Sequence, residues 1–367
     1  MSAIHAAAKQ IMFHLPPLRS FARGVAREPL WGLDLIRCQQ GVLEIEGWAL
    51  PPESGPGDAD FTLNGRPFEH VEYPRERDDI GRVFWWLKGS ARSGFRCRTH
   101  FAAANGSPLA LDYVSRSSGR PFSGLHGFAV RQQDGLPLPA PERRQRVQGS
   151  DSECFFLQEG CSAYVKLEQA LREHAGKSYG EFSRVLDWGC GCGRLARHFA
   201  PGLKPRLTGV DIDGDNVAWC RENLGFAEFA AVPLHPPTDL PAGGFDLLIG
   251  ISVFTHLAED VQREWLGELR RLAAPGAILL MTVHGLTSAV RCGRPAHLLR
   301  FLASRGCYNM GACIDLDGFI SDSEYYQSVY LSERYIRRHW SDYFEVVSII
   351  PGYIGNNQDL VILRRTR

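Results

Sequence analysis

The feature that most constrains this chain is the segment Arg184–Arg194, in which glycine occupies every second position from Gly189 to Gly193. An apolar run and an acid, Asp187, precede the glycines, and apolar residues at helical spacing follow from Leu195. This order predicts a strand, a tight turn and a helix. Glycine suits such a turn because a Cβ would disfavour positive φ and hold the backbone away from a ligand. The turn is therefore predicted to contact a ligand.

The segments after this turn alternate between short apolar runs and helical patterns, which is typical of a parallel sheet covered on both faces. Two later strands, 344–350 and 359–363, are joined by a short connection, which indicates an antiparallel hairpin. We therefore expect an α/β fold with a mostly parallel seven-stranded sheet and one reversed pair at its edge. The five parallel strands are predicted at residues 184–188, 207–211, 227–232, 245–253 and 277–283.

Helices are predicted where apolar residues recur at helical spacing and where capping residues precede them. Between about residues 285 and 330 the pattern is irregular, and we expect a helical and loop insertion with a loop at 306–322. The predicted helices are 163–174, 194–200, 215–224, 260–272, 297–303 and 332–340, the last capped by Ser332.

The region before the α/β pattern has the alternation of half-buried strands, with the hairpin signal Asn64-Gly65. Its spacing favours a smaller all-β, sandwich-like domain. We expect a leader at 1–28, this β-rich domain at 29–131, a linker at 132–150 and the α/β domain at 151–367. The predicted strands of the β-rich domain are 42–48, 61–63, 83–87, 94–99, 109–114 and 127–130.

Four tryptophans of the β-rich domain admit two interpretations. Their flat faces could stack on a sugar ring, or the side chains could simply build the core. The four are Trp31, Trp48, Trp85 and Trp86.

Composition excludes several classes of function. At 367 residues the chain exceeds one ordinary domain. The 41 basic and 41 acidic side chains balance, which removes the electrostatic attraction typical of nucleic-acid binders. The basic run at 143–146 is interpreted as a solvated linker or helix face. The 10 scattered cysteines form no Cys-x-x-Cys pair, which indicates reduced thiols and a cytoplasmic protein, and favours no metal site. No stretch reaches the ~18 apolar residues of a membrane span.

The glycine turn alone admits two ligands. A dinucleotide would bind a Gly-x-Gly-x-x-Gly or Ala turn, and counting from Gly191 to Ala196 technically satisfies that pattern. Asp187 before the turn favours a cationic ligand instead, because a carboxylate there would repel a pyrophosphate and attract an ammonium group. Asp211 ends the next strand, where a carboxylate can accept hydrogen bonds from both hydroxyls of a ribose.

With these motifs the chain resembles the S-adenosylmethionine-dependent methyltransferases of the Rossmann-like class over about residues 155–365. The segments that resemble the family are 187–193, 209–213, 245–250 and 272–276. The resemblance implies S-adenosylmethionine as cofactor, with Gly189, Cys190 and Gly191 along its methionine part and Asp187 near its ammonium group. It also implies that Asp211 holds the ribose and Ile212 lies against the adenine.

The adenine contact departs from the family pattern. Family members often have an acid after the third strand, where this chain has Val232, so backbone groups or Asp239 would have to meet the adenine. Gly193 and Val232 complete the predicted cofactor-binding set. Asp213 is interpreted as a helix-leading or solvent-facing acid.

Two histidines follow the fourth and fifth strands, at the strand ends that face the transferred methyl group. His256 and His284 are the candidate bases, because a histidine can accept a hydroxyl proton near neutral pH. The alternative for each is a hydrogen-bonded loop histidine with no part in the reaction. We expect methyl transfer to a small-molecule or glycan acceptor, at oxygen.

The glycan expectation rests on the tryptophans and on a looser resemblance to methyltransferases of bacterial surface-polysaccharide synthesis. The segments that carry this resemblance are 47–51, 64–67 and 351–360. Two alternatives remain open: a nicotinamide-dependent oxidoreductase on the same kind of sheet, and a non-catalytic binding scaffold.

Overall fold

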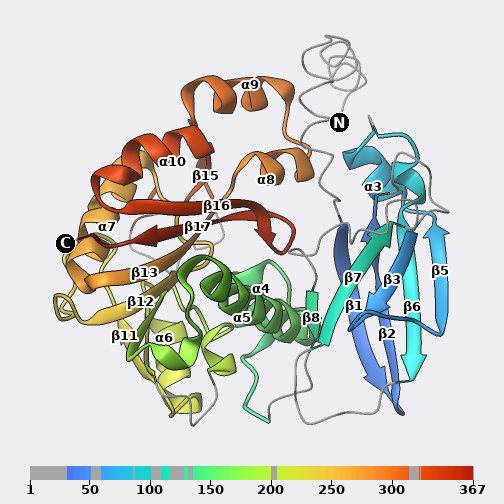
Figure 1. Cartoon of the computed structure of the whole chain (residues 1–367), viewed down its shortest axis with the longest axis horizontal. Coiled ribbons are helices and arrows are strands. Elements are labelled where there is room, and N and C mark those ends of the chain that lie inside the picture. The colour runs from blue at the N-terminus through green and yellow to red at the C-terminus, as the bar shows by residue number, and fades with distance from the viewer. Residues whose placement is uncertain are drawn as a thin grey trace.

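The computed structural model describes residues 31–50, 59–85, 87–100, 109–115, 128–130, 135–199, 205–313, 322 and 324–366. A β-rich module and a larger α/β domain lie side by side (Figure 1). The predicted leader, 1–28, falls outside the described residues.

The β-rich module contains two four-stranded antiparallel sheets. Buried side chains of both sheets, among them Ile45, Phe61 and Phe95, form one cluster. The Asn64-Gly65 hairpin is confirmed, because Leu63 pairs with Arg66 across it. In sheet order, the strands are β1 (Trp31–Gln39), β2 (Val42–Ala49), β6 (Gly94–His100) and β5 (His70–Arg75), then β4 (Arg66–Pro67), β3 (Ala59–Leu63), β7 (Leu109–Ser115) and β8 (Phe128–Val130).

One predicted strand of this module is wrong. Val83 is the last residue of the short helix α3 (Asp78–Val83), Phe84 and Trp85 form a turn after it, and the 3-10 helix η1 (Ser90–Arg92) comes next in the described part of the chain. Two acids in the first turn of α3 favour the helix, and Phe84 is buried after it. The tryptophans also divide: Trp31 and Trp48 are 0% and 6% exposed, whereas Trp85 is 38% exposed. Trp31 and Trp48 are therefore core residues, and Trp86 lies outside the described residues.

The α/β domain is built on a seven-stranded, mostly parallel sheet, as predicted. β17 is the strand that runs antiparallel to its neighbours, and it lies between β13 and β16. The predicted antiparallel hairpin of β16 and β17 is confirmed. Only β17 is reversed relative to the other strands, because β16 runs parallel to β13. In sheet order the strands are β11 (Glu228–Ala231), β10 (Arg206–Asp211), β9 (Arg184–Trp188), β12 (Phe245–Gly250), β13 (Ala273–Val283), β17 (Gln358–Arg364) and β16 (Glu345–Ile354).

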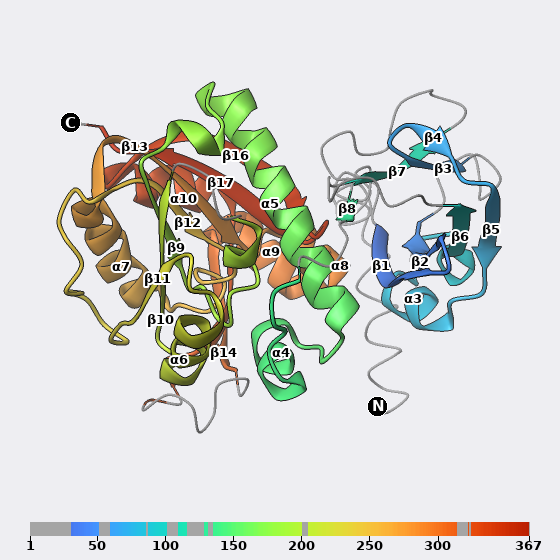
Figure 2. The same ribbon diagram turned by 90° about the horizontal axis from the view of Figure 1, so that it is seen from below.

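The helices cover both faces of the sheet (Figure 2). Within the predicted helix 194–200, the described residues form only the 3-10 turn η3 (Ala196–His198). Part of the predicted loop 306–322 is the strand β14 (Cys307–Ala312), which pairs with β15 (Gln327–Leu331). The α-helices of this domain are α4 (Pro141–Gln148), α5 (Glu153–Ala175), α6 (Gly214–Asn223), α7 (Glu259–Leu272), α8 (Leu286–Arg291), α9 (Ala296–Arg305) and α10 (Glu333–His339), with 3-10 helices η2 (Tyr179–Glu181) and η5 (Trp340–Asp342).

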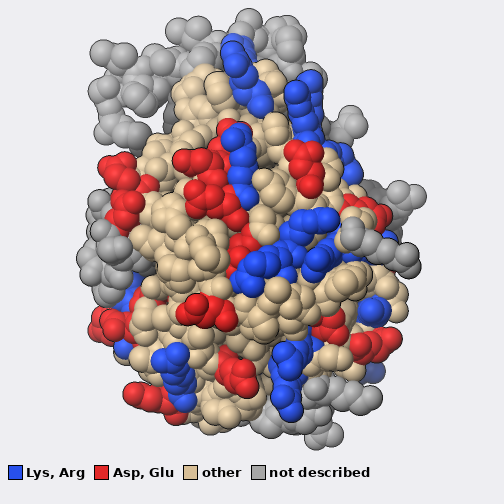
Figure 3. All heavy atoms as spheres, turned by 90° about the vertical axis from the view of Figure 1, so that its left-hand side faces the viewer, with Lys and Arg blue, Asp and Glu red and all other residues tan. Residues whose placement is uncertain are grey.

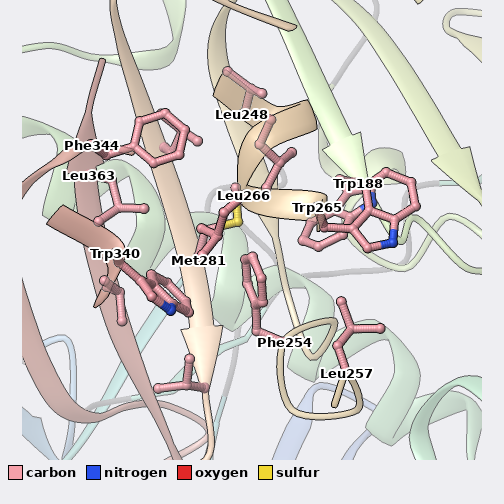
Figure 4. Close-up of a cluster of buried hydrophobic side chains, with 14 of the residues drawn as sticks. Trp188, Leu248, Phe254, Leu257, Trp265, Leu266, Met281, Trp340, Phe344 and Leu363 are labelled. Carbon is pink, nitrogen blue, oxygen red and sulfur yellow. The ribbon is translucent and has the colours of Figure 1, made fainter. Parts of the chain in front are cut away.

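The strands place alternate side chains into two cores, one on each face of the sheet. Leu186 and Trp188 of β9 enter the core under α7 and α10, and Val185 enters the one under α5 and α6. In the first core, Trp188 lies 5.1 Å from Trp265 between ring centroids, and Phe254 packs between Trp188 and Trp340 (Figure 4). These large rings fix the ends of β9 and β12, where the cavity described below opens.

The surface carries both signs of charge. On the face shown in Figure 3, the coloured Lys and Arg side chains are interspersed with Asp and Glu, in keeping with the balanced composition. None of the helices in the described part of the chain is long and apolar enough to cross a membrane.

Arg291 of α8 joins the two parts. Its Nη1 donates hydrogen bonds to the carbonyl oxygens of Trp31, at 2.7 Å, and of Asn356, at 3.0 Å. Its guanidinium lies 4.8 Å from the ring centroid of Trp48. Around it, Phe84 of the β-rich module and Leu299 of α9 belong to one buried apolar cluster. The β-rich module is therefore packed onto the α/β domain by apolar contacts and by one arginine.

We expect Arg291→Met to lower the free energy of unfolding by about 2 to 4 kcal/mol, because two partly buried carbonyl oxygens lose a charged donor. Urea unfolding followed by tryptophan fluorescence measures the change. Arg300→Met, at an exposed position of α9, is the control and should stay within about 0.5 kcal/mol of the parent. Equal stability of the two variants would contradict this assignment.

Candidate functional site

The glycine turn after β9 adopts the conformation that its sequence predicts. Gly189, Gly191 and Gly193 have φ values of +76°, +52° and +77°. The N–H groups of Gly189 and Cys190 both donate to the carbonyl oxygen of Val210, at 2.8 and 3.0 Å. These bonds hold the turn against the end of β10.

The three glycines serve different contacts. A Cβ on Gly189 would lie 2.3 Å from Val253, and one on Gly191 would lie 3.0 Å from Val147 of α4. A Cβ on Gly193 would lie 2.3 Å from Leu224 beyond α6. Gly193 is therefore required for packing beneath the turn, whereas Gly189 and Gly191 lie at the cavity.

A cavity of about 130 Å³ opens at the carboxyl ends of β9, β10 and β12. Most of the predicted site residues line it, but Gly193 and His284 are not among its lining residues. α4 and the loops after β12 and before β15 also contribute to the wall. The predicted residues that line it are Asp187, Gly189, Cys190, Gly191, Asp211, Ile212, Val232 and His256.

Asp187 is the most unusual group in this wall. Its side chain is 2% exposed, and among the residues that the structure describes no donor lies within hydrogen-bond distance of its Oδ2. Burial raises the pKa of Asp187 to about 7; the nearby Asp211 adds to the rise, and Arg194 opposes it. A buried carboxylate oxygen without a donor is costly. The site therefore favours a ligand that brings a cationic donor.

Asp211 is tied to the backbone around it. Its Oδ2 accepts a hydrogen bond from Gly191 N at 2.7 Å, and its Oδ1 accepts one from Asp213 N at 2.8 Å. Burial raises the pKa of Asp211 to about 6, against the lowering effect of these bonds. The carboxylate is thereby fixed at the end of β10 and faces the cavity.

Asp213 leads α6 as expected but does not face solvent. It caps the helix by accepting from Asp215 N and Asn216 N, at 3.0 and 3.1 Å. Its Oδ2 also pairs with Arg146 Nε of α4 at 2.8 Å, and the exposed fractions of the Asp213 and Arg146 side chains are 4% and 8%. The solvent-facing interpretation of Asp213 is therefore wrong, and the basic run 143–146 is not a solvated one.

His256 lines the cavity, and a hydrogen bond fixes which of its ring nitrogens carries a proton. Its Nδ1 lies 2.9 Å from the carbonyl oxygen of Gln327, which can only accept, so Nδ1 carries the proton. The lone pair is therefore on Nε2 in the neutral ring. The ring stacks on Tyr326, with centroids 4.0 Å apart and planes 14° apart. Gln327 N also donates to His256 O at 2.9 Å, which fixes the backbone on both sides.

His284 has a different environment. Its ring centroid lies 6.2 Å from that of His256 and 5.2 Å from that of Tyr330. Burial lowers the pKa of His284 to about 3, assisted by the charges of His256 and Arg294. His284 is therefore neutral at physiological pH, and it is not among the residues that line the cavity. Its predicted role as a base gains no support from this position.

Ser252 was not predicted and has no distinguishing sequence signal. It lines the cavity with φ of +62°, a conformation unusual for a residue with a side chain. Ser252 N donates to Thr282 Oγ1 at 2.8 Å, Thr282 Oγ1 donates to Gln358 Oε1 at 2.7 Å, and Gln358 Nε2 donates to Ser252 Oγ at 2.7 Å. This closed ring of three hydrogen bonds holds the serine hydroxyl at the ends of β12, β13 and β17.

α4 was also missed, although it had a signal. Pro141 occupies its first position and Gly149 closes it with φ of +71°, the usual order of these residues around a helix. Arg146 and Val147 of α4 line the cavity. Among the described residues, no group of three or more His, Cys, Asp or Glu side chains could hold a metal ion.

The chain was compared with known protein families and with solved structures. Residues 185–276 match the family model described as "Methyltransferase domain". Three solved structures are similar at low identity. An S-adenosylmethionine-dependent methyltransferase from Methanosarcina mazei is 18% identical, covering 51% of this chain and 93% of its own, with a TM-score of 0.38. The 1,6-didemethyltoxoflavin-N1-methyltransferase of Burkholderia thailandensis, solved with S-adenosylhomocysteine, is 17% identical, covering 65% and 96%, with a TM-score of 0.39. The DhpI complex with SAH is 16% identical, covering 61% and 93%, with a TM-score of 0.40.

The matched segment runs from β9, through the glycine turn and Asp211, to the start of β13. It therefore contains most of the cavity wall and the motifs that distinguish an adenosyl sulfonium from a dinucleotide. Residues 185–276 of this chain are therefore similar to a methyltransferase domain.

Proposed function

We propose that this protein is a methyltransferase that uses S-adenosylmethionine as its methyl donor and acts on a hydroxyl oxygen of a small molecule, free or as part of a glycan, with His256 as the base. The observation that carries the proposal is the hydrogen bond from His256 Nδ1 to the Gln327 carbonyl, because His256 lines the same cavity as Asp187. This bond puts a proton on Nδ1, so Nε2 carries the lone pair when the ring is neutral.

The cavity residues fit the cofactor. The Asp187 oxygen that lacks a donor among the described residues would accept a hydrogen bond from the ammonium group of the methionine part. The glycine turn lets this part approach the backbone at Gly189 and Gly191. Asp211 would hold the ribose, and Ile212 and Val232 would flank the adenine from two neighbouring strands.

Bound S-adenosylmethionine supplies an electrophilic methyl group on a positively charged sulfur. An acceptor hydroxyl that takes this methyl group must lose its proton, and in this proposal His256 Nε2 would receive it. The stacked Tyr326 ring and the Gln327 carbonyl hold the imidazole in one orientation, which is what a general base requires.

Ser252 supports an oxygen acceptor. Because its Oγ accepts the Gln358 amide proton, its own proton can be donated into the cavity that it lines. A hydroxyl group both donates a proton, as His256 requires, and accepts one, as Ser252 requires. An ammonium group lacks a lone pair to accept from Ser252. A carboxylate lacks a proton to give His256.

The glycan part of the proposal has less support. Trp31 and Trp48 are buried, so neither can stack on a sugar. The looser resemblance of the β-rich module to those of polysaccharide methyltransferases stays a prediction, as does the cytoplasmic location. The proposal therefore specifies a hydroxylated acceptor, of which a glycan is one example.

The function is tested with S-adenosylmethionine that carries a deuterated methyl group, incubated with pooled metabolites and with defined saccharides. Mass spectrometry identifies labelled products, and their stability to mild base separates ethers from esters. Asp211→Ala, which we expect not to bind the cofactor, is the control. A labelled ether supports the proposal, whereas label exclusively on nitrogen, sulfur or carbon contradicts it.

We expect the affinity for S-adenosylhomocysteine to rise with pH. The pKa of Asp187 is about 7 in the folded protein, so a ligand that needs the carboxylate must displace a proton below that pH, at a cost of up to about tenfold in Kd per pH unit. Asp211, whose pKa is about 6, extends the trend to lower pH. The free protein shows the opposite sign, since the stability contributed by protonated Asp187 is lost as pH rises through 7.

Calorimetry from about pH 5.5 to 8 measures this dependence. Asp187→Asn should weaken binding about tenfold or more at pH 8 and flatten the dependence between pH 6 and 7. Asp215→Asn, at an exposed position in the first turn of α6, should leave both unchanged. An unaltered pH profile in Asp187→Asn would exclude Asp187 as the partner of the ammonium group.

We expect His256→Gln to lower kcat by about 10²- to 10⁴-fold toward the acceptor found above, because the amide can bond to the Gln327 carbonyl but cannot take a proton. The Kd for S-adenosylhomocysteine should stay within about twofold. His235→Gln, which changes an exposed histidine outside the cavity lining, is the matched control. Equal loss of turnover and cofactor affinity would make His256 a cofactor-holding residue instead.

A further inference from the structure

Helix α4 lies directly over the glycine turn and next to α6 (Figure 2). The missing Cβ of Gly191 would meet Val147 of α4 at 3.0 Å, and Cys192 Sγ lies 4.0 Å from the carbonyl oxygen of Arg143. Val147 and Arg146 both line the cavity. A helix outside the segment that matches the methyltransferase model thus forms one wall of the cofactor cavity.

Arg146 is held in this wall by Asp213. The Nε to Oδ2 distance is 2.8 Å, and both side chains are nearly fully buried. Asp213 Oδ2 also accepts from Asn216 Nδ2 at 2.8 Å, and Oδ1 accepts from two N–H groups of α6. The carboxylate is therefore engaged with the protein, and its role is to position the guanidinium.

The placement of Arg146 is unusual for a purely structural arginine. It lies at the N-terminus of α6, where the helix dipole disfavours a cation. Removing an ion pair from water is also costly, and such pairs are seldom retained for stability alone. Arg146 Nη2 also donates to Asn216 Oδ1 at 3.4 Å, so the planar guanidinium is held in the wall of the cavity that Ile212 also lines. Such a group matches the ring nitrogens and face of an adenine, which offer acceptors and a π surface.

We propose that Arg146 contacts the adenosine half of the cofactor and that, with Val147, it slows cofactor release. This contact would add an adenine contact of a different kind in a chain that has Val232 where the acid after the third strand is commonly found. The inference rests on the proposed placement of the ribose at Asp211 and of the adenine at Ile212 and Val232.

The test uses two probes, S-adenosylhomocysteine and adenosine, with calorimetry for affinity and stopped-flow fluorescence for dissociation. Arg146→Met should weaken both probes by about tenfold or more and speed the dissociation of S-adenosylhomocysteine by a similar factor. Arg143→Met is the matched control, because this arginine lies on the same helix and bonds to the same Asn216 but is outside the cavity lining. It should change neither probe by more than about twofold.

Arg146→Lys separates a ligand contact from a structural bond to Asp213. An ammonium group can keep the ion pair but lacks the planar fork. We therefore expect the lysine variant to recover the melting temperature of the parent while its affinity for both probes stays low. The inference would be overturned if Arg146→Lys recovered the affinity for the probes together with the melting temperature. It would also be overturned if Arg146→Met bound both probes as tightly as the parent.

Two further variants separate failure of this inference from failure of the cofactor placement. Asp187→Asn should weaken S-adenosylhomocysteine but leave adenosine unchanged, and Asp211→Ala should weaken both. If Asp211→Ala binds both probes normally, the placement itself is wrong. If it loses both while Arg146→Met loses neither, only the role of Arg146 is rejected.

Discussion

The site depends on one backbone acceptor, the carbonyl oxygen of Val210. It receives hydrogen bonds from both Gly189 N and Cys190 N, and so stops the chain from continuing β9 as a strand. Since β9 and β10 are paired in parallel, with Gly209 beside Asp187, this junction also places Asp187 and Asp211 on adjacent strand ends. Two carboxylates with raised pKa values, a glycine turn and the cavity all follow from that register.

Individual elements could be predicted where the element contains its own sequence signal. The apolar run 245–253, predicted as a strand, contains the buried strand β12 (Phe245–Gly250), and Ser332 caps α10 by accepting from Tyr335 N at 3.2 Å. The predicted helix at 194–200 failed because the chain after Gly193 makes only a 3-10 turn before leaving the sheet. The predicted strand at 83–87 failed because Phe84 is buried against other elements rather than in a sheet.

The candidate site contains both residues that belong to sequence motifs and residues that only the fold brings together. Asp187 and the first two glycines belong to one motif and Asp211 to the next, at the ends of two paired strands, and all line the cavity. Arg146 and Ser252 reach it from elements whose contacts are set by tertiary packing: α4 folds back over the turn, and Ser252 depends on Gln358, 106 positions further along the chain. The sequence did not distinguish which of the two histidines, His256 or His284, is the better candidate for the base. The structure separates them by burial and by the Gln327 carbonyl.

The position of β17 has a consequence for how the protein is made. β17 follows β16 in the chain but lies between β13 and β16. During synthesis, β16 leaves the ribosome with no neighbour to pair with, and the edge of β13 stays open until residues 358–364 emerge. Gln358 begins that strand and completes the ring around Ser252. The nascent chain therefore closes its sheet and assembles its reaction site in the same late step.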